Sequence, residues 1–262
     1  MSDVGGDNTA RIAVLVKQIP DPGQIAIDAE SRAPQYGGSL VVNTFDTYAV
    51  AEAIDFKERY RADVTVVSVG PAPARDAILR GLATGADRGL HLVVDDLDRR
   101  DSLAVATLIA DALRDRGFDL ILAGQISEDV ETGQVGPQVA ELLGIPHVSL
   151  VTGIEVDGAE FRIRRDSEGR KQLVGVAMPC MALVLSGRDG EQRHPTLRGM
   201  MQAKRKPIEE IVVPSFDETP RMTWSDPVAP VRVRTAVIAQ DVAPADAAKR
   251  LVGWLHEKKI VV

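Results

Sequence analysis

The sequence is poor in the residues that mark several functional classes. Its single cysteine, Cys180, excludes an internal disulfide and a cysteine-rich metal cluster. Aromatic residues make up 4% and the formal net charge is −7, so neither a base-stacking platform nor a basic face for nucleic acid is expected. No segment approaches the roughly 20 apolar residues that cross a bilayer, and residues 1–10 have no apolar signal region. We therefore expect a cytoplasmic protein with a flexible tail at residues 1–10, no nucleic-acid partner and no direct membrane insertion.

Catalytic and metal-binding motifs are equally scarce. No P-loop is present and no GxGxxG follows the first apolar run, so neither an NTPase nor a typical dinucleotide-dependent dehydrogenase is indicated. No nucleophile elbow or paired-carboxylate motif stands out. Cys180 precedes a short apolar run, which predicts a buried thiol rather than a nucleophile. The histidines lack metal-ligand spacing: His91, His147, His194 and His256. The sequence thus predicts no catalytic residue and no metal site.

The first part of the chain alternates short apolar runs with segments of helix length. The apolar runs cover residues 11–17, 40–42, 64–69, 90–94 and 119–124, and the helical segments begin near residues 43, 72, 101 and 132. This alternation predicts an α/β fold with a mostly parallel, doubly wound sheet and helices on both faces. In such a sheet, ligands bind beyond the carboxyl ends of the strands, where the winding direction reverses.

The pattern changes after residue 146. Three short runs separated by Asp157-Gly158 and residues 167–169 predict a small antiparallel addition. Residues 213–231 contain four prolines and predict an extended linker. The chain closes with an amphipathic helix at about residues 244–258, which packs either on a partner or back on its own domain. We expect a tail (1–10), an α/β domain (11–212), and a linker with a C-terminal helix (213–262) that packs on a partner.

The segment from Gly124 to Pro137 is a candidate phosphate site. It lies between the end of a predicted strand and the start of a predicted helix, where unsatisfied N–H groups and the helix dipole favour an anion. Gly133 allows close approach of a phosphate, and Thr132 and Gln134 could bond phosphate or ribose. The same pattern is also typical of a simple capped turn. The strand-end loops at residues 43–46 and 69–71 would lie beside the same crevice.

Residues 192–206 place apolar side chains within a basic stretch. Leu197, Met200 and Met201 precede three consecutive cations, Lys204, Arg205 and Lys206. One interpretation is a surface loop followed by a solvated cationic helix. The other is a docking loop whose apolar anchor sits inside a charged rim that steers the encounter with a partner.

Seven blocks of sequence carry a family resemblance. They are residues 16–21, Asn43 with 48–53, 64–71, 82–88, 119–124, 132–137 and 193–204. Their order and spacing, from about Arg11 to Ile211, resemble the electron-transfer flavoprotein beta subunit. No single block is specific, but the whole set is.

The resemblance implies an adenine-nucleotide-binding, Rossmann-like fold and a heterodimer with an alpha subunit that carries most of the redox FAD site. The beta subunit of such a pair usually buries one AMP as a structural ligand. The pair accepts electrons from flavin-dependent dehydrogenases, commonly acyl-CoA dehydrogenases, and passes them to a quinone reductase or another acceptor.

The resemblance also implies site residues. The nucleotide site would comprise Leu15, Lys17, Asn43, Thr44, Phe45, Asp46, Val69, Asp129, Val130, Glu131, Thr132, Gly133, Gln134 and Val135. Leu197 falls where the family places the leucine that docks into a dehydrogenase. The other members of this recognition loop would be Met200, Met201, Lys204, Arg205 and Lys206.

One loop departs from the family pattern. Residues 128–134 form a shorter loop than the mitochondrial type and resemble in length the electron-bifurcating members, which bind a second FAD in place of AMP and oxidise NADH. Val130 stands where those members carry glycine, and Gly133 where they carry alanine. We expect AMP, with the bifurcating complex as the alternative. A stand-alone nucleotide sensor of the universal-stress type is a further alternative, although it would need neither the recognition loop nor the C-terminal arm.

Overall fold

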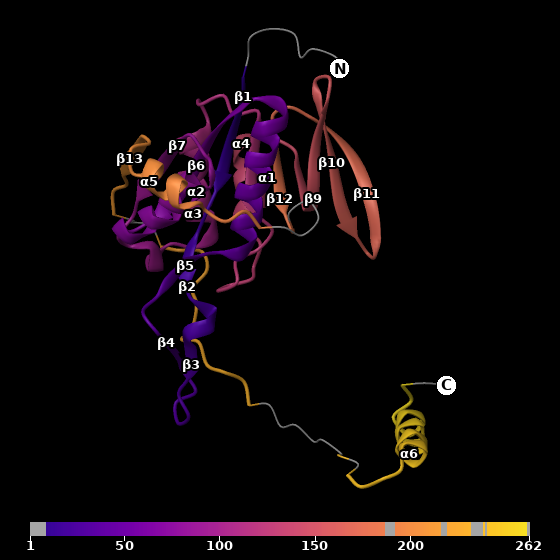
Figure 1. Cartoon of the computed structure of the whole chain (residues 1–262). Coiled ribbons are helices and arrows are strands. Elements are labelled where there is room, and N and C mark those ends of the chain that lie inside the picture. Colours follow the sequence, from indigo (N-terminus) through magenta and orange to yellow (C-terminus); the bar gives the residue numbers. More distant parts are fainter. Residues whose placement is uncertain (1–8, 187–191, 216–218, 232–237, 239, 261–262) are drawn as a thin grey trace.

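The computed structural model describes residues 9–186, 192–215, 219–231, 238 and 240–260. Its large sheet contains β1 (Ala10–Leu15), β6 (Ala62–Gly70), β7 (Arg88–Val93), β8 (Leu120–Gly124), β9 (His147–Asp157), β10 (Glu160–Ser167), β11 (Arg170–Ala177), β12 (Cys180–Val184) and β13 (Ile208–Val212). The spatial order is β11-β10-β9-β12-β8-β1-β6-β7-β13 (Figure 1). In this spatial order, every neighbouring pair from β9 through β12, β8, β1, β6 and β7 to β13 is parallel. The pairs β9–β10 and β10–β11 are antiparallel. The predicted α/β fold with a small antiparallel addition is confirmed.

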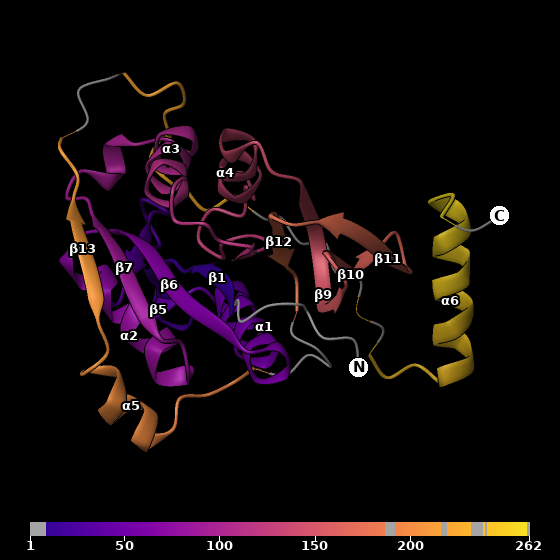
Figure 2. The same cartoon turned by 90° about the horizontal axis from the view of Figure 1, so that it is seen from above.

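Helices cover both faces of the parallel part. Helices α1 (Thr44–Tyr60) and α2 (Arg75–Thr84) pack on one face, and α3 (Ser102–Leu113) and α4 (Val135–Leu143) on the other (Figure 2). Alternate residues of each central strand supply the two cores, as the pleat of a strand requires. Ile12 and Val14 of β1 belong to the first core, while Ala13 and Leu15 belong to the second. Strands buried on both faces explain why the sequence shows continuous apolar runs.

The winding direction reverses between β1 and β8. The chain passes from β1 to β6 and β7 on one side, then returns to add β8 and later β12 on the other side. All these strands are parallel, so the carboxyl ends of β1 and β8 lie side by side at the point of reversal. This edge of the sheet is the predicted position of a ligand.

Two small sheets were missed by the sequence prediction. β2 (Gln18–Pro20) pairs with β5 (Leu40–Val42), and β3 (Ile25–Ile27) pairs with β4 (Pro34–Tyr36). The apolar run at residues 40–42 was expected, but it forms this separate pair instead of joining the large sheet. The β3–β4 hairpin projects away from the large sheet (Figure 1).

Some boundaries also differ from expectation. The helix expected from about residue 132 begins at Val135, because Gly133 has a φ of +61° and cannot continue a right-handed helix. Strand β13 was not expected, since its sequence IEEIV carries two charged residues at the sheet edge. Three short 3₁₀ turns, η1 (Pro22–Gln24), η2 (Ala72–Ala74) and η3 (Leu97–Arg99), complete the connections of the α/β region.

The C-terminal region leaves the sheet. Residues 219–231 form no helix or strand, as the proline content predicted. Helix α6 (Pro244–Glu257) lies apart from the sheet (Figure 1), with none of its residues buried and with Leu251, Val252 and Trp254 exposed. Residues 1–8 of the expected tail, and 216–218, 232–237, 239, 261 and 262 of the expected C-terminal region, lie outside the described residues. Among the helices that the structure describes, none is long and apolar enough to span a membrane.

Candidate functional site

A buried carboxylate joins the two strand ends at the point of reversal. Asp46, in the first turn of α1, accepts hydrogen bonds from the Lys17 backbone N–H at 2.7 Å and from the Gly124 N–H at 3.1 Å, one on each oxygen. Gly124 is required for this approach, because a Cβ there would lie 2.4 Å from the Asp46 carboxylate. The Asp46 side chain therefore holds the ends of β1 and β8 at a fixed separation.

The Asp46 carboxylate is nearly inaccessible to solvent. Burial raises the pKa of Asp46 to about 7, against hydrogen bonds from Lys17, Asn43 and Gly124 that lower it. The group consequently changes protonation near neutral pH, in the wall of the crevice.

The loop after β8 is tied to the start of α1. Asn43, which is buried, donates from Nδ2 to the Ile126 carbonyl at 2.9 Å, and its Oδ1 accepts from the Glu128 N–H at 3.2 Å. The Thr44 N–H donates to a Glu128 carboxylate oxygen at 3.2 Å. Lys17 reaches the same loop and pairs with Asp129, with a closest N–O distance of 2.7 Å. These contacts bring three of the predicted segments into one rim.

Beyond the strand ends lies a cavity of about 520 Å³. The predicted nucleotide-site residues that line it are Leu15, Lys17, Asn43, Asp46, Val69, Asp129, Val130, Thr132, Gly133, Gln134 and Val135. Thr44, Phe45 and Glu131 do not line it. The volume falls within the range of about 300–1,000 Å³ that is usual for small-molecule sites.

The lining of the cavity divides by chemistry. Val69, Val105 and Ile109 contribute apolar surface, whereas Lys17 and the loop after β8 contribute polar groups. The N-terminus of α4 opens on the same space, because its first residues, Val135 and Gly136, belong to the lining. Unpaired N–H groups at a helix N-terminus favour an anion. The cavity can therefore hold a molecule with a flat apolar part and an anionic part.

Several lining residues were not predicted. They come from η3, from α3 and the residues just before it, and from the C-terminal arm, which is the predicted linker with its helix (residues 213–262): Leu97, Asp98, Arg100, Asp101, Ser102, Val105, Ile109, Met222 and Trp224. The α3 residues could have been found from the topology, since α3 starts at the same edge of the sheet. No sequence signal places residues 222 and 224 at this cavity, because the arm has no periodic pattern.

The second candidate site is the recognition segment, residues 192–206. Its helix α5 (Leu197–Ala203) is capped by Thr196, whose hydroxyl accepts from the Gly199 N–H at 3.0 Å. Leu197, Met200 and Met201 are 74%, 48% and 66% exposed, while Ala203 is buried. The opposite face lies on α2, and a Cβ at Gly199 would come within 2.2 Å of the Ala83 carbonyl oxygen. The apolar side chains are thus displayed on a short helix that is held from behind.

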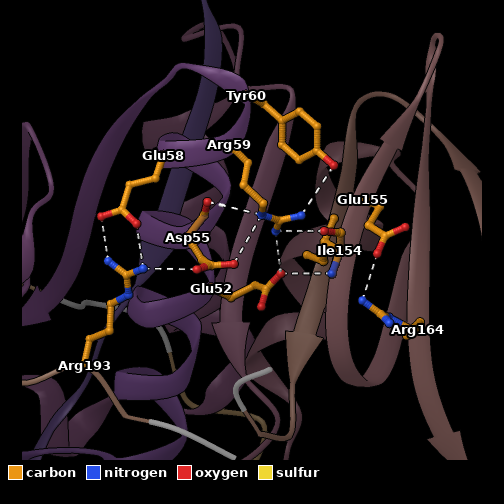
Figure 3. A network of polar contacts seen from close by, with 9 residues as sticks. All are labelled: Glu52, Asp55, Glu58, Arg59, Tyr60, Ile154, Glu155, Arg164 and Arg193. Carbon is orange, nitrogen blue, oxygen red and sulfur yellow. Dashed lines mark hydrogen bonds and ion pairs between the residues drawn. The ribbon is translucent and has the colours of Figure 1, made fainter. Parts of the chain in front are cut away.

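Arg193 anchors the start of this segment to α1. Its guanidinium forms two parallel hydrogen bonds to the Glu58 carboxylate, both at 2.7 Å, and a third to Asp55 at 3.0 Å (Figure 3). The hydrogen bond from Arg193 holds the pKa of Glu58 below its usual value, and that with Glu58 raises the pKa of Arg193. Bidentate pairing fixes the orientation of the guanidinium as well as its position.

The same network continues across α1 to the sheet. Asp55 also pairs with Arg59 at 3.2 Å, and Arg59 donates to the Ile154 carbonyl at 3.1 Å (Figure 3). The buried Glu52 accepts from the Ile154 N–H at 2.9 Å. A continuous chain of polar contacts therefore links the recognition segment to β9.

The cations at the other end of the segment differ in their surroundings. Lys204 and Arg205 are exposed. Lys206 donates to the carbonyls of Leu82 and Ala86, at 2.9 and 2.5 Å, and burial lowers its pKa. Lys206 therefore anchors the end of the segment to the C-terminus of α2. Contact of any of these residues with a partner stays a prediction.

The remaining candidates show no reactive arrangement. Cys180 is buried, and burial raises the pKa of its thiol to about 12. His91 is buried and its Nε2 lies 3.0 Å from the Gly70 carbonyl oxygen. Within the part of the chain that the structure describes, no group of three or more histidine, cysteine, aspartate or glutamate side chains could hold a metal ion.

Comparison with known proteins connects this geometry to a family. Residues 37–215 match the family described as "Electron transfer flavoprotein domain". The electron transfer flavoprotein subunit beta of Bacillus subtilis is 31% identical over 255 residues, covering 95% of this chain and 98% of that protein.

Two further relatives show the breadth of the likeness. The subunit beta of Bradyrhizobium diazoefficiens is 35% identical over 238 residues, or 89% of this chain and 94% of that protein. The acryloyl-CoA reductase electron transfer subunit gamma of Anaerotignum propionicum is 31% identical over 202 residues, or 76% of each chain. The matched region includes both the crevice loops and the recognition segment.

Proposed function

The chain belongs to the electron transfer flavoprotein family as a homologue of its beta subunits, and from this membership we propose a specific role for each of its two sites. The strand-end crevice binds one AMP. The recognition segment docks a flavin-dependent dehydrogenase, with an acyl-CoA dehydrogenase as the expected donor. The chain pairs with an alpha subunit that carries the redox FAD, and the pair passes electrons to a quinone reductase or another acceptor.

The crevice is the observation that carries this proposal. Its apolar part suits an adenine ring, and the N-terminus of α4 with Lys17 suits a phosphate. Bound there, a nucleotide would occupy the join between β1 and β8 and stabilise the subunit by mass action. This role requires no catalytic residue of the chain.

We infer that AMP, and not a second FAD, occupies the crevice. FAD consists of AMP joined to a flavin mononucleotide, so it would need space well beyond one nucleotide. The Lys17–Asp129 ion pair lies in the lining and ties the loop after β8 to the end of β1. The short loop at residues 128–134 is the feature that keeps the bifurcating alternative open.

The test is the nucleotide content of the complex. The chain is co-expressed with its alpha subunit, and the purified complex is denatured so that chromatography and mass spectrometry quantify the released nucleotides. One FAD and one AMP per heterodimer are expected. Two FAD and no AMP would favour the bifurcating complex, and oxidation of NADH would then be assayed. A chain that stays monomeric and free of nucleotide contradicts both roles.

A further inference from the structure

Part of the C-terminal arm lies at the crevice. Met222 and Trp224 belong to the lining of the 520 Å³ cavity, although they lie far from the other lining residues in sequence. The arm starts along the same edge of the sheet, because the Val213 N–H donates to the Val93 carbonyl at 3.0 Å at the end of β7. The first half of the arm therefore belongs to the nucleotide-binding region.

Asp101 holds the arm at this position. One carboxylate oxygen accepts from the Ala104 N–H at 2.9 Å and caps α3. The other accepts from the N–H groups of Arg221 and Met222, at 2.7 and 3.3 Å. Asp101 is only 7% exposed, and these backbone hydrogen bonds, led by that from Ala104, hold its pKa below the usual value. The Asp101 carboxylate thus joins α3 to the arm.

Arg100 provides a second attachment. Its side chain, 4% exposed, pairs with Asp96 at 2.9 Å and donates to the Pro214 carbonyl at 2.7 Å. Two consecutive residues before α3 therefore hold the arm at two points, Pro214 and residues 221–222. Such paired attachment is expected of a structural wall rather than of a free linker.

Trp224 adds an aromatic side chain to the lining of the cavity. Leu97, Val105 and Ile109 contribute apolar surface to the same cavity, and Trp224 remains 64% exposed. A large aromatic side chain that lines a cavity while keeping most of its surface uncovered can gain burial when a planar ligand binds. Purine bases stack on such rings.

We propose that residues 219–224 form a wall of the nucleotide crevice, that Asp101 positions this wall, and that Trp224 contacts the base of the bound nucleotide. This inference rests on the proposed nucleotide-binding function and names residues that act in it. On this proposal the arm has two parts. Residues 219–224 enclose the nucleotide, whereas α6 lies apart from the sheet.

Asp101→Asn separates the two roles of the side chain. Asparagine remains a good N-cap and can still accept from Ala104, but its amide group cannot accept from Arg221 and Met222. Asp111→Asn is the matched control, since Asp111 lies on the same helix, forms an exposed pair with Arg114 and does not line the cavity. Trp224→Ala removes the aromatic surface without changing charge.

The experiment uses the heterodimer loaded with radiolabelled AMP and chased with excess unlabelled AMP. We expect Asp101→Asn and Trp224→Ala to release AMP at least tenfold faster than wild type and Asp111→Asn. Equal release rates in all four proteins would contradict the proposal that residues 219–224 form a wall of the crevice. A wild-type heterodimer that retains neither AMP nor, in a parallel loading, FAD would contradict the proposed nucleotide binding itself. This outcome differs from equal release rates, so failure of the wall and failure of nucleotide binding are distinguishable.

Tryptophan fluorescence gives a second readout that a purely structural role would not move. The chain has two tryptophans, Trp224 and Trp254, and Trp254 lies on α6. AMP should change the emission of the Trp254→Phe heterodimer and leave that of Trp224→Phe unchanged. The reverse pattern would show that the base does not contact Trp224.

Discussion

The crevice and the recognition segment differ in how far they are exposed to solvent. The crevice is built from strand ends and backbone groups, and its central carboxylate is buried. The recognition segment displays exposed apolar side chains on a short helix that polar contacts hold at both ends. A ligand that stays bound needs enclosure, whereas a partner that comes and goes needs a rigid but accessible anchor. The difference indicates that the two sites can be disabled separately.

The largest expected effect concerns the buried carboxylate of the crevice. The pKa of Asp46 is raised to about 7 in the folded protein, so the folded state keeps a proton that the unfolded state loses above about pH 4. The free energy of unfolding should therefore fall as pH rises, by about 1.4 kcal/mol per pH unit and roughly 2–3 kcal/mol between pH 5 and pH 7. About one unit above pH 7 this contribution is lost and the curve becomes flat.

Urea unfolding of wild type and Asp46→Asn across this pH range measures the effect. The variant should lack the slope that Asp46 contributes, so the difference between the two curves should change with pH. Parallel curves would show that Asp46 titrates alike in the folded and unfolded states.

The next effect concerns the exposed anchor. Leu197→Ala should slow reduction of the flavin by the partner dehydrogenase at least thirtyfold, because an anchor residue at an interface contributes about 2 kcal/mol or more. Stopped-flow measurement of flavin reduction at limiting dehydrogenase gives the rate. Leu173→Ala, which truncates another exposed leucine, on β11, serves as the control and should keep the wild-type rate. Equal losses in both variants would remove the special role of Leu197.

A third effect tests the support behind α5. Gly199→Ala places a Cβ against the Ala83 carbonyl, and overpacking of this kind costs about 1–3 kcal/mol. Thermal unfolding should show the loss, and flavin reduction should slow because Leu197 is displaced. Gly253→Ala is the matched control, since nothing lies within 4 Å of its Cβ in α6. That variant should be neutral or up to about 1 kcal/mol more stable, and a neutral Gly199→Ala would refute the close packing.

The smallest effect concerns the ion pairs at the start of the segment. Arg193→Gln removes the contacts with Glu58 and Asp55, and such partly exposed pairs contribute up to about 1 kcal/mol. We expect flavin reduction to slow by up to fivefold, with a smaller loss at high salt because screening already weakens the wild-type pairs. Arg162→Gln breaks an exposed pair with Asp157 on the antiparallel addition and should have no effect on this rate. A loss of the same size in both variants would argue against anchoring by Arg193.

The two regions also differ in how far sequence predicts them. The continuous apolar runs of β1, β6 and β8 predicted the parallel sheet, and the sheet topology alone predicted a ligand at the ends of its strands. The glycine-containing loop before α4 lines the cavity at those strand ends, although the helix itself starts later than expected, and its role as a phosphate site stays a prediction.

The parts that sequence did not predict depend on contacts between distant residues. A helix was expected to begin near Asp101, but no sequence signal indicated that this carboxylate also accepts from the N–H groups of residues 221 and 222, which carry no pattern. Likewise, the pairing of Arg193 with α1 follows from the tertiary fold, because neither segment has a motif for it. Strand β13 was missed because edge strands need only weak apolar character.

The most direct test of separate sites is to measure AMP release and flavin reduction on the same two heterodimers. Leu197→Ala should keep the wild-type rate of AMP release and lose at least thirtyfold in flavin reduction by the dehydrogenase. Asp101→Asn should release AMP at least tenfold faster while flavin reduction, measured before the AMP is lost, stays near wild type. If both variants lost both properties together, the crevice and the recognition segment would form one coupled site, and their independence would be contradicted.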